Sequence, residues 1–282
     1  SPSKSKDLIK YIKDSEIIVI RSATKLTKEI LLNAKKLKII ARCGVGVDNI
    51  DLEFAKSNKI SVTNSPAANI ISVVELTVAL IINAARKISL ADTHVKNGEW
   101  DKSEFSGVEL YGKKLGIIGF GKAGRLVAER MKSFGMSVIF YDPYVVDWDG
   151  PEEKKELDEV LQISDVISIH VIKTKETENL ISKDRLDLLK ENSIIINTSR
   201  GDVLDEAYLF ELLKSKKIYG AGLDVYSSEP PQNIETLKNI NIVTTPHIGA
   251  STFEAQLKAG MDIVDNIKKM LSGDNSVEIQ HF

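Results

Sequence analysis

The stretch KKLGIIGFGKAGRLVAERM (residues 113–131) decides the fold, because it joins an apolar run, a glycine-rich turn and a helix-forming segment. Its glycines, Gly119, Gly121 and Gly124, have the spacing GxGxxG, which also arises by chance in ordinary turns. Here the turn follows a β-type run and opens a helical one, the context in which such a turn binds a dinucleotide pyrophosphate. Gly119 would permit the tight turn, Gly121 the approach of phosphate, and Gly124 close helix–strand packing. The phosphates would lie at the positive end of the helix.

The next strand-like run indicates which dinucleotide is bound. SVIFYDP contains Asp142, 18 residues after Gly124 (142 − 124), close to the ~20 expected for a carboxylate that binds the adenosine ribose. A carboxylate there repels a 2′-phosphate, and no arginine stands beside it in YDPYVVD. The sequence therefore predicts NAD rather than NADP as the cofactor.

Apolar runs alternate with helix-period segments on both sides of this stretch. The pattern is typical of an α/β fold with parallel sheets and crossover helices. Earlier in the chain, strand-like runs at 16–20, 38–41 and 59–62 are separated by helical segments at 27–36 and 51–57. From Leu115 onward there are six strand-like runs, LGIIG, SVIFYD, DVISIH, SIIINTS, YGAGLDV and INIVTT, with helical segments near 123–134, 157–162, 183–190 and 205–214. Six strands suffice for a complete doubly wound sheet.

Two further segments bear on the domain organisation. A chain of 282 residues exceeds the size at which single cores tend to split. The segment 69–88 has so few polar residues that a helix there must be covered on every side, by another domain or another subunit. It also fits a central core helix of one domain. The amphipathic segment 252–271 predicts a long final helix that returns to the first domain, while 97–112 reads as an irregular arm.

Composition excludes several classes of function. The chain is 43% hydrophobic and 28% charged with a net charge of −2, so there is no electrostatic case for binding nucleic acid or an anionic membrane. No apolar run approaches the ~20 residues of a membrane span, and no signal-peptide pattern opens the chain. The single cysteine, Cys43, excludes an internal disulfide and fits a reducing compartment, so we expect a cytoplasmic protein. No metal site is predicted.

Three chemically reactive residues follow three successive predicted strands: Arg200, Glu229 and His247. Ligands of open α/β sheets bind beyond the carboxyl ends of the strands, so we expect these side chains at one site. Hydride transfer between a 2-hydroxy acid and NAD needs a guanidinium for the carboxylate, a base for the hydroxyl proton and an acid that orients the base. Arg200, His247 and Glu229 could fill these roles in turn. Individually, they also fit a surface ion pair, a strand cap and a solvated turn residue.

The sequence resembles the D-isomer-specific 2-hydroxyacid dehydrogenase family over almost its whole length. The resemblance rests on blocks that occur in the family's order: RSATKLT (21–27), ARCGVGVDNIDLE (41–53), NSPAANIISVVELT (64–77), LGIIGFGKAGRLVAERMKSFGM (115–136), TSRGDVLDE (198–206), DVYSSEPP (224–231) and TPHIGASTFEAQ (245–256). It implies two Rossmann-like domains with parallel sheets and an active site in the cleft between them. A discontinuous substrate-binding domain (1–65 and 252–282) and an NAD-binding domain (66–251) are expected, as is a homodimer formed through region 69–112.

The resemblance also assigns roles to residues. The catalytic residues would be Arg200, Glu229 and His247. The dinucleotide contacts would be Gly119, Gly121, Lys122, Ala123, Gly124, Asp142, Val171, Thr198, Ser199, Asp224, Gly249 and Ala250. The substrate contacts would be Arg21, Arg42, Gly44, Val45, Gly46 and Asn69, with the 44–46 backbone receiving the carboxylate and the two arginines a phosphate. A substrate with a carboxylate and a dianionic phosphate needs more than one arginine. Arg21 and Arg42 also fit structural ion pairs at strand ends.

The expected activity is the oxidation of D-3-phosphoglycerate. The family's substrate domain begins with one more strand and helix, so we expect this chain to start after them. We also expect no C-terminal regulatory domain. One alternative is a reductase of glyoxylate, hydroxypyruvate or D-lactate on the same scaffold. The other is a corepressor-type binding protein that senses NAD, although the sequence contains no docking tail or basic surface.

Overall fold

The computed structural model describes residues 5–232, 234–238, 240–274 and 277. The chain divides into two compact units, Ser1–Ser72 with Ala250–Phe282 (unit 1) and Val73–Gly249 (unit 2). The first crossing lies in the first turn of helix α4 (Ile70–Arg86), some residues after the boundary expected at 65.

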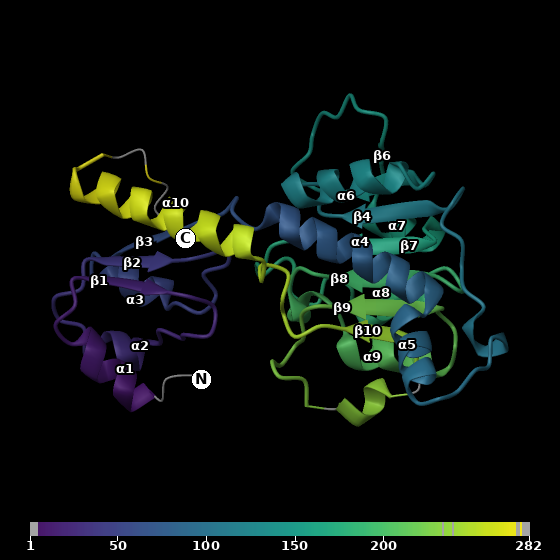
Figure 1. The fold of residues 1–282 in the computed structure, drawn as a ribbon. Helices are drawn as coiled ribbons and strands as arrows, with labels where there is room; N and C mark the ends of the chain where they lie inside the picture. The colour runs from purple at the N-terminus through teal and green to yellow at the C-terminus, as the bar shows by residue number, and fades with distance from the viewer. Residues whose placement is uncertain (1–4, 233, 239, 275–276, 278–282) are drawn as a thin grey trace. The chain divides into compact units, whose positions relative to one another are not determined.

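Unit 1 contains a three-stranded parallel sheet in the order β1-β2-β3. Its elements are α1 (Ser5–Ile12), β1 (Ile17–Ile20), α2 (Lys28–Leu31), β2 (Ile39–Arg42), α3 (Leu52–Ser57), β3 (Ser61–Asn64) and α10 (Phe253–Leu271). Helix α10 covers one face of the sheet and α1, α2 and α3 lie on the other (Figure 1). The three predicted strands and the returning helix are therefore confirmed.

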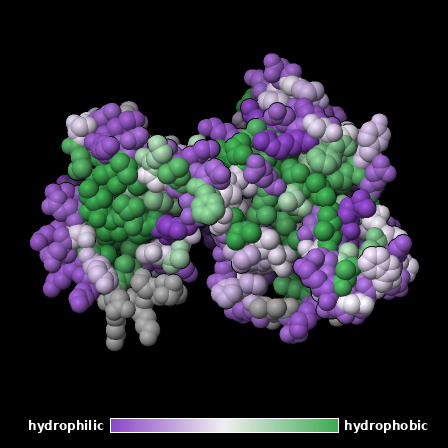
Figure 2. Space-filling model, viewed as in Figure 1, coloured by the Kyte–Doolittle hydropathy of each residue, from purple (hydrophilic) through white to green (hydrophobic). Residues whose placement is uncertain are grey.

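One helix of unit 1 is shorter than the sequence predicts. The helix expected over 27–36 is only α2, because the side chain of Asn33 donates hydrogen bonds to the carbonyls of Glu29 (2.7 Å) and Ile30 (3.3 Å) and competes with helix continuation. Strand β1 is the edge of the sheet and leaves Val19 54% exposed. Figure 2 shows hydrophobic residues gathered on the side of unit 1 that is turned to the viewer.

Unit 2 contains a seven-stranded parallel sheet in the order β10-β9-β8-β7-β4-β5-β6. Its strands are β4 (Lys114–Ile118), β5 (Ser137–Tyr141), β6 (Glu153–Lys154), β7 (Val166–Ile169), β8 (Ile194–Asn197), β9 (Gly220–Leu223) and β10 (Ile242–Thr244). Six of them were predicted, so the predicted count was one too low. Strand β6 was missed because it consists of two exposed charged residues and carries no apolar run.

The helices of unit 2 precede its first strand or lie between its strands in the chain. They are α4, α5 (Ile88–Lys96), α6 (Lys122–Lys132), α7 (Leu157–Ile163), α8 (Lys183–Asp187) and α9 (Glu206–Lys214), with 3₁₀ turns η1 (Ser103–Phe105), η2 (Gly201–Val203) and η3 (Ile234–Leu237). The single helix expected over 69–88 is interrupted at Lys87. Its φ of 51° is left-handed, which ends α4 and redirects the chain into α5.

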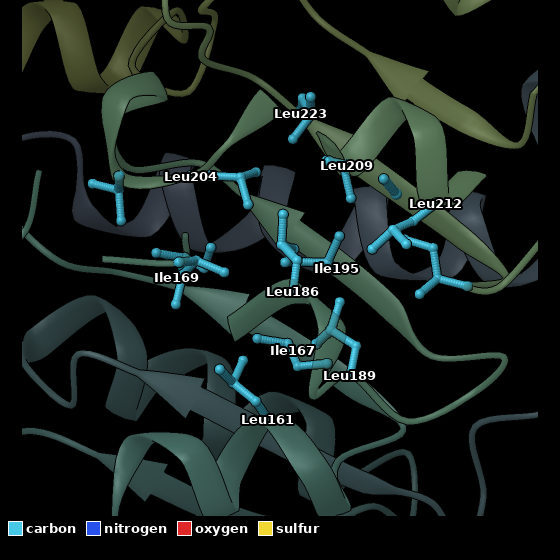
Figure 3. Packing of buried hydrophobic residues seen from close by; sticks show 14 of the residues in the cluster. Leu161, Ile167, Ile169, Leu186, Leu189, Ile195, Leu204, Leu209, Leu212 and Leu223 are labelled. Atoms are coloured by element: carbon cyan, nitrogen blue, oxygen red, sulfur yellow. The ribbon is translucent and has the colours of Figure 1, made fainter. Parts of the chain in front are cut away.

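The core of unit 2 lies between one face of the sheet and helices α7, α8 and α9. Ile167, Ile169 and Ile195 project from the strands onto Leu161, Leu186 and Leu209 of the helices, all at 0% exposure (Figure 3). The other face is covered by α4 and α6. A Cβ placed on Gly222 of β9 would lie 3.0 Å from Leu80 Cβ of α4, so strand and helix are in close contact.

The strand order places β4 between β5 and β7, so the chain runs outward from β4 in both directions. The turn after β4 therefore lies at the switch point of a doubly wound sheet, where such folds bind their ligands. Helix α4 buries Val74, Leu80 and Ile81 but leaves Ile71 43% exposed, so the chain alone does not cover it completely. Among the described residues, no helix is both long and apolar enough to cross a membrane.

Candidate active site

The three glycines of the turn after β4 differ in what a side chain at each position would contact. Gly119 has a φ of 92°, and a Cβ there would be 2.7 Å from the carbonyl oxygen of His170. Gly124 lies in the first turn of α6, where a Cβ would collide with the carbonyl oxygen of Gly119. Gly121 is the N-cap of α6, and no heavy atom of the described chain lies within 4 Å of a Cβ built there. The turn is therefore tightly packed on one side and open at Gly121.

Asp142 directly follows β5 and lies beside this turn. Its Oδ2 accepts a hydrogen bond from the Phe120 amide at 2.8 Å, and its Oδ1 accepts one from the Tyr144 amide at 2.9 Å. Each oxygen keeps acceptor capacity for a ribose hydroxyl. Lys122 and Ala123 contribute amides of the first helical turn, and Val171 Cγ1 would be 3.0 Å from a Cβ on Gly119. An open turn at a helix N-terminus with an adjacent carboxylate fits a dinucleotide.

Arg200, Glu229 and His247 follow β8, β9 and β10, which are adjacent parallel strands, so their loops leave the same edge of the sheet. The structure brings the ring of His247 onto the carboxylate of Glu229. Nδ1 of the ring lies 2.9 Å from Oε2 and 3.0 Å from Oε1, with the side chains 44% and 41% exposed. An acid and a base are therefore paired at this edge.

Several charges act on Glu229. Burial raises the pKa of its carboxyl group, but the hydrogen bond and charge of His247 lower it. The Tyr226 amide and the charge of Arg200 lower the pKa as well, and the net shift is downward. Arg200 follows the neighbouring strand β8, so its charge acts on Glu229 from the same edge of the sheet. Glu229 is therefore held as a carboxylate.

The turn that presents Arg200 is built by Asn197, the buried last residue of β8. Its Nδ2 donates to the carbonyl of Arg200 at 2.8 Å, and its Oδ1 accepts from the amide (3.0 Å) and hydroxyl (2.9 Å) of Ser199. Thr198, also in this turn, shares a hydroxyl–hydroxyl bond of 2.8 Å with Thr77 of α4. Sequence reasoning missed Asn197. An asparagine that ends an otherwise apolar strand, where this residue type is depleted, was the available signal.

The Arg200 turn and the loop that carries Glu229 are in direct backbone contact. A Cβ on Gly201 would collide with the backbone of Tyr226 and Ser227. Oε2 of Glu206 accepts a hydrogen bond from the Ser227 amide at 3.0 Å. The Tyr226 hydroxyl donates to the carbonyl of Leu223 or Thr245, and burial is the main reason that its pKa rises to about 12. The sequence analysis did not predict these contacts of Gly201, Glu206 and Tyr226.

Asp224 and Gly249, the next candidates of unit 2, follow β9 and β10 at the same edge of the sheet. Gly249 donates its amide to Oδ2 of Asp224 at 2.8 Å, and a Cβ on Gly249 would be 3.2 Å from Val73 Cγ2. Ala250 is the first residue of the second segment of unit 1. Among the residues that the structure describes, no group of three or more His, Cys, Asp or Glu side chains could hold a metal ion.

The candidate substrate residues belong to unit 1. Arg21 follows β1, and Arg42 ends β2 in register with Ile20, so the two arginines leave neighbouring strands at the same end. Burial raises the pKa of the Cys43 thiol, while the charges of Arg21 and Arg42 oppose the rise. Asn69 directly precedes α4.

The Gly44–Gly46 loop is shaped by its neighbours. Gly44 has a φ of 132°, and a Cβ there would collide with the guanidinium of Arg42. The Asn64 side chain donates to the Val45 carbonyl at 2.5 Å, and the Ser65 amide donates to the Gly44 carbonyl at 3.0 Å. Asn64 is a further support that sequence reasoning missed.

Comparison with known proteins identifies the family. The model for the D-isomer specific 2-hydroxyacid dehydrogenase, NAD binding domain, matches residues 78–249. The chain belongs to this family. It contains the family's NAD-binding domain, and the matched residues include the turn after β4 and Asp142.

Three relatives illustrate the similarity. The chain is 46% identical to the D-3-phosphoglycerate dehydrogenase of Methanocaldococcus jannaschii over 272 residues, which are 95% of this chain and 52% of that protein. It is 45% identical to the hydroxypyruvate reductase of Thermotoga maritima over 268 residues, 94% of this chain and 88% of that protein. The crystal structure of D-lactate dehydrogenase from Aquifex aeolicus, complexed with NAD and lactic acid, is 34% identical with a TM-score of 0.86, covering 94% and 86% of the two chains.

The chain spans about half the length of the phosphoglycerate dehydrogenases that it matches. It spans most of the hydroxypyruvate reductase. These matches therefore give the family and the NAD-binding domain. The matched enzymes are named for different substrates, so the matches do not specify one substrate.

Proposed function

We propose that this chain carries the NAD-dependent oxidation of D-3-phosphoglycerate to 3-phosphohydroxypyruvate, the entry step of serine biosynthesis. The observation that carries the proposal is the pairing of His247 Nδ1 with the Glu229 carboxylate at 2.9 and 3.0 Å, on the sheet edge that also presents Arg200. Similarity to phosphoglycerate dehydrogenases at 46% identity supports this substrate.

The acid–base chemistry follows from the His247 tautomer. Because Nδ1 faces Glu229, the neutral ring carries its proton there and its lone pair on Nε2. Nε2 is the nitrogen that takes the hydroxyl proton of the substrate, and NAD bound at the glycine turn would supply the hydride acceptor for C2. The imidazolium that forms is stabilised by Glu229, whose lowered pKa keeps it ionised. In the reverse direction the same nitrogen returns the proton to the carbonyl oxygen.

Binding of the anionic substrate is assigned to three arginines. Arg200 binds the carboxylate through paired N–H donors and polarises the C2 oxygen, as guanidinium groups do with planar anions. Arg21 and Arg42, whose charges both act on Cys43, supply two cations to a dianionic phosphate. A substrate without a phosphate would not need them.

The central test is an assay of NADH absorbance with D-3-phosphoglycerate as substrate. His247→Ala should bind NADH as the wild type does and lose about 10²–10⁴-fold in kcat, since general acid–base catalysis contributes that much. Wild-type turnover in this variant would remove His247 from the mechanism. A wild-type chain that binds NADH without turning over any 2-hydroxy acid would favour the NAD-sensing binding protein.

A second candidate function is the reduction of hydroxypyruvate, because the hydroxypyruvate reductase of Thermotoga maritima is 45% identical over 88% of its length. Arg21→Ala and Arg42→Ala distinguish the two. If these arginines bind phosphate, kcat/KM should fall at least about tenfold for D-3-phosphoglycerate and little for D-glycerate. Lys36→Ala, which removes an exposed cation paired with Asp14, is the matched control. Unchanged kcat/KM for both substrates would favour the reductase.

We also propose that the protein is a cytoplasmic homodimer that associates through region 69–112. This region exposes large apolar side chains that water solvates poorly, including Ile71, Ile88, Val95, Trp100 and Tyr111 at 43%, 48%, 51%, 76% and 76%. Analytical ultracentrifugation should give a dimer for the wild type and a weakened one for Ile88→Glu. A wild-type monomer at micromolar concentration would contradict the proposal.

A further inference from the structure

Asp224 has an unusual hydrogen-bonding pattern for a predicted cofactor contact. It directly follows β9, and the residue is only 1% exposed. Its Oδ1 accepts from the Thr245 hydroxyl at 2.6 Å and from the Ile248 amide at 2.8 Å, and its Oδ2 accepts from the Gly249 amide at 2.8 Å. All three donors belong to the segment 245–249, which carries His247. The carboxylate is therefore directed into this turn.

The turn needs such support because of the backbone of His247. Its φ is 54°, in the left-handed region that costs free energy for a residue with a Cβ. Within the described residues, the main-chain hydrogen bonds of this turn include one from the His247 amide to the Thr245 carbonyl at 3.0 Å and one from the Thr245 amide to the Leu223 carbonyl at 3.0 Å. Asp224 binds the segment on both sides of His247, once before it and twice after it. Charge-assisted bonds of this kind are stronger than neutral ones.

We propose that Asp224 is a positioning residue for the acid–base pair: its carboxylate fixes the 245–249 turn and so holds His247 on Glu229. The proposal rests on the proposed function for the role of that pair. It differs from the sequence expectation, in which Asp224 contacts the dinucleotide. A carboxylate suits the position because Thr245, Ile248 and Gly249 all donate to it. An asparagine would place an amide N–H against one of these donors in either orientation.

The first experiment compares wild type with Asp224→Asn by crystallography and steady-state kinetics. We expect His247 Nδ1 to move out of hydrogen-bond distance of Glu229 and kcat to fall about 10²-fold, the effect of misplacing a reacting group by about 1 Å. The KM for the 2-hydroxy acid and the Kd for NADH, measured by fluorescence, should change by less than about threefold. A variant that keeps wild-type kcat but binds NADH weakly would overturn the proposal in favour of the cofactor contact.

A second pair of variants keeps the test valid if Asp224→Asn does not fold. Thr245→Val preserves the shape of the side chain but removes one donor to Asp224, whereas Thr245→Ser retains the hydroxyl. We expect Thr245→Val to lose kcat with unchanged NADH affinity and Thr245→Ser to recover it. Equal kcat in the two variants would contradict the proposal. Asp142→Asn, which alters the ribose carboxylate, should raise the Kd for NADH and shows that the assay detects a lost cofactor contact.

The kinetic assays and the crystal structures together distinguish failure of this inference from failure of the proposed function. Absence of wild-type turnover with every 2-hydroxy acid would reject the function. The crystal structure of Asp224→Asn, or of Thr245→Val, would still report the turn. A His247 ring that remains 2.9–3.0 Å from Glu229 in the variant would reject the positioning role whatever the activity.

Discussion

Gly201→Ala should disturb the active site by a backbone collision. Gly201 follows Arg200, and the Cβ of an alanine there would overlap the carbonyl of Tyr226 and the amide nitrogen of Ser227. The Cβ would lie 1.9 Å from the Tyr226 carbonyl carbon and 2.4 Å from the Ser227 nitrogen, so to reach the ~3.5 Å of ordinary carbon contacts the two backbones must separate by about 1–1.6 Å. The Tyr226 amide is hydrogen-bonded to Oε1 of Glu229 at 3.4 Å, so this separation moves the acid as well as the arginine.

The expected magnitudes follow from that displacement. Overpacking against atoms that cannot rotate away costs about 1–3 kcal/mol of unfolding free energy. At about 2–4 °C per kcal/mol for a domain of this size, the melting temperature should fall by several degrees. A shift of about 1 Å between the Arg200 turn and the Glu229 loop should lower kcat about 10²-fold.

The assays are thermal unfolding by circular dichroism and NADH-linked kinetics. Gly260→Ala is the matched control, because Gly260 lies in α10 and no heavy atom of the described chain is within 4 Å of its Cβ position. This control should be stabilised by about 0.5–1 kcal/mol, the helical preference of alanine over glycine. A Gly201→Ala protein with the melting temperature and kcat of the wild type would refute the argument that the two loops are in unrelieved contact.

Three further predictions concern unit 2. Gly121→Ala should keep the melting temperature of the wild type but bind NADH at least about tenfold more weakly. Gly124→Ala should lower the melting temperature of the cofactor-free protein. Calorimetry with and without NADH distinguishes the two variants. Burial lowers the pKa of His170 to about 4, so the unfolded chain takes up this proton first as the pH falls from about 6.5 to 4. The native state should lose up to about 3 kcal/mol in that window. Urea titrations should give a flatter pH profile for His170→Asn, and parallel profiles would contradict this assignment. Lys132→Met should cost about 1–3 kcal/mol by urea unfolding at pH 7, because it leaves the buried carboxylate of Glu152 without its partner; an unchanged midpoint would contradict this.

Much of the fold could be predicted because its signals are local. The glycine turn, six strands of the larger sheet, three of the smaller sheet and helix α10 are each encoded by a run of neighbouring side chains. The shared location of Arg200, Glu229 and His247 could be expected for a similar reason, since parallel strands that are adjacent in the sheet send their carboxyl ends to one edge. Strand β6 and the break at Lys87 carry no apolar pattern and were missed.

The sequence by itself therefore determined the class of fold, the cofactor turn and which side chains could meet. Only the tertiary structure decided how they are held: Asp224 on the turn of His247, Asn197 under Arg200, and Gly201 against the Glu229 loop. The physical reason is that the structural role of a buried polar atom, or of a glycine, depends on the group that lies against it. In the first and third of these contacts that group comes from another strand's loop, about 25 residues along the chain, and no periodic pattern of hydrophobic and polar residues specifies such a partner.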